Sequence, residues 1–179
     1  MITRVTTNII KTITTGILIC TIYRLRLTQW LSPAFPLGSF AYSHGLETAI
    51  TEGLVRDSDT LSRWLISVLR DGTGLSDATL LCRSLAGDSV ADYARALAAS
   101  KERLEESEAQ GAAFSRTLKG MGLDVEPAPL PVAVGQAART LALGPAQIAA
   151  LYLQSFAGNL VSCAVRFVPL GQSEGQKIL

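Results

Sequence analysis

Four neighbouring side chains of types that can do chemistry lie at Tyr42, Ser43, His44 and Glu47, directly after a loop rich in proline and glycine. A serine nucleophile needs a base that is itself oriented by a third group. In a helix, however, adjacent side chains such as Ser43 and His44 point about 100° apart, and no GxSxG turn is present. Hydrolysis is therefore disfavoured. We expect His44 and Glu47 to form hydrogen bonds that fix the loop, with contact to a partner or a metal as the alternatives.

The rest of the chain lacks the usual patterns of an enzyme. It contains no P-loop, GxGxxG or HExxH sequence, and Gly72-Thr-Gly74 is more simply a helix break. One histidine and three separated cysteines (Cys20, Cys82 and Cys163) offer no clustered ligands for zinc. An odd cysteine count without CxxC pairs is typical of reduced, cytoplasmic thiols. These features favour a binding module over an enzyme, with no catalytic residue and no metal ligand assigned.

A second distinctive stretch begins with Asn159, inside a long apolar segment, and continues through Val168 to Lys177. A buried amide must find hydrogen-bond partners. We therefore expect Asn159 to hold another backbone segment in place, with a role in an interface as the alternative. Residues 171–176 resemble a polar turn that starts a further short helix.

Composition limits the kind of partner. The 179 residues carry a formal charge of +1, which gives no reason to expect nucleic acid. Apolar residues make up 48% and charged residues only 17%, with a mean hydropathy of +0.30. Such a chain either hides apolar surface in a subunit interface or lies in a membrane. No run reaches the roughly 18 uninterrupted apolar residues of a spanning helix, so we expect the interface.

The order of helix signals predicts an all-α, single-domain bundle of about seven to eight helices. Asp57, Ser58 and Asp59 offer capping oxygens at a helix start, and Pro145 suits a first helical position. A cluster of acidic residues in the helix 101–120 is expected to face solvent. The expected helices cover residues 39–52, 57–70, 76–86, 89–97, 101–120, 132–143 and 145–168, and the acidic cluster comprises Glu102, Glu105, Glu106 and Glu108.

Residues 1–26 differ from the remainder. They include seven threonines and four basic residues but no acid, and the first acidic residue of the chain is Glu47. We interpret them as an atypical extension outside the fold, with an organellar presequence or an amphipathic anchor as alternatives. The domain is then expected to span residues 27–179.

From Leu27 to the last residue, the sequence resembles the urease accessory protein UreF family. Leu31–Glu47 is similar to the family segment SPAFPxGxFAYSHGLE, and Asn159–Leu179 is similar to NLVSxAVRxVPLGQxxGQxxL. The positions that carry over as family-signature or partner-binding candidates are Pro36, Gly38, Tyr42, His44, Gly45, Glu47, Asn159, Pro169, Leu170, Gly171, Gln172, Gly175 and Gln176.

The resemblance implies a helical, non-catalytic scaffold, usually a homodimer, in the cytoplasm. Such a scaffold binds UreD (also called UreH), recruits and modulates the GTPase UreG, and so helps to insert nickel into apo-urease. Nickel is then handled by the complex and GTP by the partner, and the resemblance assigns no nickel ligand to this chain. Family members usually continue beyond the position of Leu179 through further helices and a tail. The alternatives are therefore a non-functional truncated fragment or a membrane-associated helical protein.

Overall fold

The structure, a computed structural model, describes residues 18–39 and 42–179. Within these residues it is helical and contains no strand, which confirms the predicted all-α class. A helix over residues 18–30 precedes the labelled elements. These are α2 (Leu46–Thr51), α3 (Ser58–Arg70), α4 (Thr73–Ala86), α5 (Ala91–Ala96), α6 (Lys101–Gly120), α7 (Leu130–Ala138), α8 (Pro145–Phe167) and α9 (Gln172–Ile178).

Local capping explains where the best-predicted helices begin. The Asp57 side chain accepts a hydrogen bond from the Thr60 amide at 2.9 Å, and the Thr60 hydroxyl accepts one from the Asp57 amide. Ser100 caps α6, and Pro145 occupies the first turn of α8. The Asp57 and Ser100 side chains accept hydrogen bonds from amides that the first helical turn leaves unpaired. Pro145 has no amide N–H, so it leaves no donor unpaired there. The predicted starts of the helices at residues 57, 101 and 145 are thus confirmed to within one residue, and the cap at Ser100 was not predicted.

Three of the predicted boundaries were wrong, and one of them is the end of the helix expected over residues 132–143, which the structure places at Ala138. The helix expected from Ser39 begins only at Leu46, because His44 (φ 52°) and Gly45 (φ 78°) have left-handed backbone that interrupts a right-handed helix. Gly74, expected to break a helix, lies inside α4. A Cβ atom on Gly74 would lie 2.6 Å from the Cα of Leu69, so the missing side chain lets α4 approach the end of α3.

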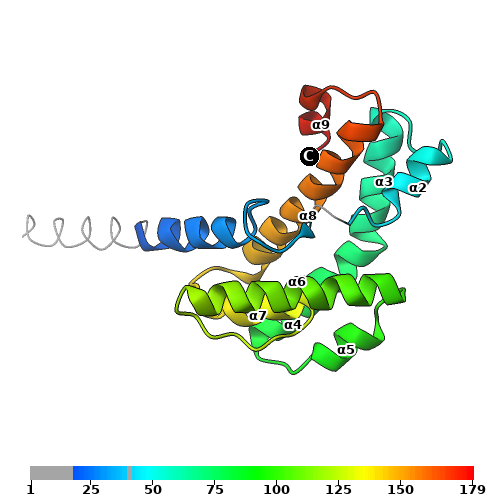
Figure 1. Ribbon diagram of the computed structural model, residues 1–179. Coiled ribbons are helices and arrows are strands. Elements are labelled where there is room, and N and C mark those ends of the chain that lie inside the picture. The colour runs from blue at the N-terminus through cyan, green and yellow to red at the C-terminus, as the bar shows by residue number, and fades with distance from the viewer. Residues whose placement is uncertain (1–17, 40–41) are drawn as a thin grey trace, which may run out of the picture.

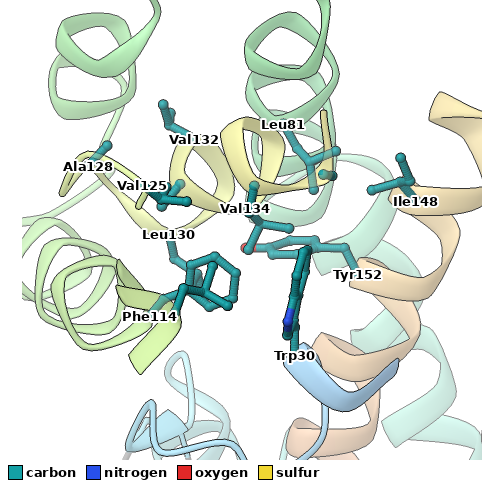
Figure 2. Packing of buried hydrophobic residues seen from close by; sticks show 14 of the residues in the cluster. Trp30, Leu81, Phe114, Val125, Ala128, Leu130, Val132, Val134, Ile148 and Tyr152 are labelled. Atoms are coloured by element: carbon teal, nitrogen blue, oxygen red, sulfur yellow. The ribbon is translucent and has the colours of Figure 1, made fainter. Parts of the chain in front are cut away.

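The long helix α8 lies at the centre and joins two apolar clusters. Its first half packs with α4, α6, α7 and the end of the N-terminal helix, and its second half packs with α2, α3 and α9 (Figure 1). In the first cluster, Phe114, Val134, Tyr152 and Trp30 converge from four helices (Figure 2). The rings of Trp30 and Phe114 meet edge to face with centroids 6.1 Å apart. The length and apolar composition of α8 would also allow it to cross a membrane, although 39% of the relevant window is buried within the protein.

The N-terminal helix contacts the body through its last turns. Leu27 and Trp30 are buried, and Tyr23 packs against the first cluster. On the other side of this helix, Leu18 and Leu25 are exposed. Of the extension expected over residues 1–26, residues 1–17 lie outside the described residues. Residues 18–26 are helical and form one helix with residues 27–30.

Candidate functional site

Residues 31–39 and 42–45, the described residues between the N-terminal helix and α2, are here named the signature loop. Two side chains from α8 hold its backbone. The Ser155 hydroxyl donates to the Leu31 carbonyl at 2.5 Å, and the Asn159 amide donates to the carbonyls of Ser39 (2.9 Å) and Tyr42 (3.3 Å). The prediction that Asn159 holds another backbone segment is confirmed. Because α8 is central, these bonds attach the loop to the rigid middle of the protein.

His44 lies at the tip of the signature loop and points inward. Its Nε2 is 3.1 Å from Oε1 of Glu106, and only 9% of its side chain is exposed. The ring meets Phe156 edge to face, with centroids 4.8 Å apart. The partner of His44 is therefore a glutamate on α6, whereas Glu47 accepts a weak hydrogen bond from the Cys163 thiol at 3.7 Å. Both side chains contact the body of the protein, as predicted, but through different partners.

Glu106 belongs to a buried polar network that links α4, α6 and α8. Its carboxylate accepts a hydrogen bond from Gln110 at 3.0 Å and pairs with Arg103 at 3.3 Å. Arg103 also donates to Asp77 at 2.7 Å, and the hydroxyl of Tyr152 donates to the same Asp77 oxygen at 2.7 Å. The expectation that Glu106 faces solvent with the other acids was wrong. It is 5% exposed because it lies one turn before Gln110 on the buried side of α6.

Burial and charge act against each other in this network. Burial raises the pKa of Asp77, and the Arg103 guanidinium and the Tyr152 hydroxyl only partly offset that rise. Burial disfavours the charge on Arg103, yet the attraction of Asp77 and Glu106 outweighs it and raises the pKa of the guanidinium. Burial and the nearby Asp77 charge raise the pKa of Tyr152 well above its ordinary value. Tyr152 therefore acts as a neutral hydrogen-bond donor.

A partly open pocket of about 60 Å³ lies between the signature loop and this network. Its lining includes His44, Arg103, Glu106, Tyr152 and Asn159. Apolar side chains, among them Leu37, Leu130 and Phe156, form much of the remaining lining, and a space of this size has room for a few water molecules beside the polar groups. Among the described residues, no group of three or more histidine, cysteine, aspartate or glutamate side chains is placed to hold a metal ion.

The second signature stretch lies at the other end of α8. The Glu174 carboxylate accepts a hydrogen bond from the Gly171 amide at 3.0 Å, which helps to start α9. Gly175 faces α8, where a Cβ atom would lie 2.9 Å from a methyl group of Val165. Glycine at this position therefore lets α9 lie directly on α8. Leu170 packs against the second cluster, while Pro169, Gln172 and Gln176 are exposed.

The candidate residues thus form two groups rather than one site. Tyr42, His44 and Asn159 lie together at the signature loop, to which Pro36, Gly38 (φ 72°) and Gly45 also belong. Glu47 lies at the start of α2, and the remainder lie after α8. The partners Asp77, Arg103, Gln110 and Tyr152 were not predicted. The burial of Glu106 could have been predicted from the four-residue spacing of positions 106, 110, 114 and 118. This spacing places Glu106 on the same face of the helix as the buried Phe114.

Comparison with known proteins identifies the family. A family model described as UreF matches residues 55–179. A urease accessory protein UreF from Cereibacter sphaeroides (strain KD131 / KCTC 12085) is 59% identical over 159 residues, covering 87% of this chain and 76% of that protein. The chain belongs to the UreF family. Relatives with the same name from Jannaschia sp. (strain CCS1) and Roseobacter denitrificans (strain ATCC 33942 / OCh 114) are 54% and 44% identical, and the chain covers 73% and 78% of them.

The sequence similarity to the UreF family extends over both parts of the candidate site. The second signature stretch lies within the family-model match. The signature loop precedes that match, but the Cereibacter alignment leaves out only 13% of the 179 residues, about 23 positions. An alignment of that extent cannot begin later than about residue 24, so it includes residues 31–47. The predicted resemblance to the family is confirmed.

Proposed function

We propose that this chain is a urease accessory protein that serves as a non-catalytic scaffold for the insertion of nickel into apo-urease. The observation that carries the proposal is the 44–59% identity to proteins named urease accessory protein UreF across most of the chain. The family resemblance supplies the finer assignment. The chain, as a homodimer in the cytoplasm, binds UreD/UreH and recruits the GTPase UreG. UreG binds the GTP, and the assembled complex handles nickel.

The architecture is suited to a scaffold because the signature stretches expose a few side chains on well-anchored backbone. Gln172 and Gln176 are exposed on α9, whose position is fixed by the packing of Gly175 on α8. Binding elements on rigid helices lose less conformational freedom than mobile loops when a partner docks. We assign Gln172 and Gln176 to partner contact, and His44 and Asn159 to the positioning of the signature loop.

Complementation tests this proposal. The chain is expressed in a urease-producing host that lacks its own UreF, soluble protein is confirmed, and urease activity is measured with nickel supplied. Restored activity is expected, together with co-purification of UreD/UreH and UreG. The Gln172→Ala/Gln176→Ala double variant should lower both readouts, whereas Gln154→Ala, an exposed glutamine on α8 outside the signatures, should lower neither. Soluble chain that neither restores activity nor retains UreD/UreH would refute the assignment.

A further inference from the structure

The tip of the signature loop has a backbone conformation that needs support. His44 and Gly45 are consecutive residues in the left-handed region, with φ of 52° and 78°. Glycine adopts this region freely, but a residue with a side chain pays a conformational cost there. Such residues persist where surrounding contacts determine their conformation. The contacts of the His44 side chain therefore decide whether the tip stays in this conformation.

The His44 side chain makes few contacts, and the carboxylate that it meets is held in place. The imidazole reaches Glu106 at 3.1 Å and Phe156 through a ring contact. Glu106 is in turn held by Arg103 and Gln110 from its own helix. If the imidazole withdraws, the carboxylate stays in place and the loop tip alone moves.

The imidazole also forms a wall between two spaces. On its inner side lies the pocket of about 60 Å³. On its outer side, a hollow of about 410 Å³ lies between residues 42–45 and the residues that begin α4 and α6. His44, Arg103 and Glu106 line both spaces. Movement of the His44 ring away from Glu106 would join them into one cleft.

We propose that residues 42–45 are a two-state lid, held closed by the contact between His44 and Glu106, whose opening joins the inner pocket to the outer hollow. In the open state, two carboxylates, Asp77 and Glu106, face the single guanidinium of Arg103. The vacated position beside Glu106 therefore favours a flat, cationic or hydrogen-bond-donating group such as imidazole. This inference concerns the free chain, and its failure would leave the proposed accessory function untouched.

Amide hydrogen exchange on the full chain tests the lid. The amides of Tyr42, Leu46 and Ala49 are suitable reporters because they donate to carbonyls within or beside the tip. His44→Asn removes the ring but tolerates left-handed backbone, and His44→Gly removes both the ring and the conformational cost. Loss of a buried contact to a charged group should speed exchange at these amides by about 10- to 100-fold in both variants. Amides of α7 should be unchanged.

Chemical rescue distinguishes a lid from general damage. Free imidazole added to His44→Gly at constant pH should restore slow exchange at the reporter amides. It should not do so in Asn159→Ala, which loosens the loop from a different side. Glu106→Gln, which keeps the shape of the side chain, should also speed exchange if His44→Gly fails to fold. Parental exchange in His44→Asn and Glu106→Gln would overturn the proposal, as would equal acceleration in α7 or an absence of rescue.

Discussion

Replacing Arg103 with methionine should be the most damaging single change to the buried network. Arg103 is the cation that pairs with both Asp77 and Glu106, and all three side chains are less than 15% exposed. Methionine fills similar space but leaves Asp77 without its cationic partner and Glu106 with His44 alone. Breaking a buried ion pair in this way costs about 3–5 kcal/mol of unfolding free energy. That is a large share of the roughly 5–15 kcal/mol that stabilises a typical domain.

The size of this loss should depend on pH in a defined direction. Burial already places the pKa of Asp77 above its unfolded value, and Arg103 opposes that rise. Removing Arg103 therefore raises the folded pKa further. A group with a raised folded pKa contributes full stability below its unfolded pKa and loses that contribution as pH rises through the folded pKa. The deficit of Arg103→Met relative to the parent should thus be larger at about pH 8 than at about pH 5.

Urea unfolding followed by circular dichroism at both pH values measures the deficit. Arg95→Met is the matched control, because Arg95 also contacts two acids, Asp92 and Glu108, but its side chain is 41% exposed. Exposed pairs contribute only about 0–1 kcal/mol. Equal losses in the two variants would refute the argument from burial. A loss in Arg103→Met that does not change with pH would refute the argument from uncompensated carboxylates.

Three further outcomes follow from individual contacts. In urea titrations, the difference in unfolding free energy between the parent and Tyr152→Phe should shrink above about pH 10. The pKa of buried Tyr152 is raised, so the parent loses about 1.4 kcal/mol per pH unit in that range. Gly111→Ala should lower the unfolding free energy by more than about 2 kcal/mol in thermal melts, since its Cβ would overlap a backbone carbonyl. The control Gly120→Ala, with nothing within 4 Å, should be neutral or stabilising. Asn159→Ala should cost about 1–2 kcal/mol and speed proteolysis within the signature loop, because two carbonyls lose their donor.

Sequence reasoning succeeded where the signal was local. Asp57 and Pro145 act within one helical turn, so their roles at helix starts could be predicted directly from the sequence. Asn159 could also be interpreted, because an amide in an apolar helix needs partners wherever they come from. The identity of those partners, at positions 39 and 42, could not be inferred from one sequence.

Prediction failed where distant contacts override local preference. Residues 42–45 lie directly before α2 and were predicted to belong to a helix, but the His44 side chain is directed to Glu106, 62 positions away in sequence. That contact supports a left-handed backbone that no local pattern indicates. Similarly, Asp77 meets Tyr152 across 75 positions. Each of these residues has an unremarkable sequence environment, and only the packing of α4, α6 and α8 brings them together.

The position of the buried network indicates what it contributes. Replacing a complete buried ion network with apolar side chains is often neutral or stabilising, so stability alone does not account for it. The network lies where the first apolar cluster meets the signature loop, and α8 continues from there into the second cluster. Apolar contacts would permit several arrangements of these elements, whereas hydrogen bonds from Arg103 and Tyr152 to one oxygen of Asp77 permit few. We infer that the network fixes the orientation of the loop on α4, α6 and α8. In the proposed scaffold role, that fixed orientation would keep the binding surfaces in the same relative positions while partners join and leave.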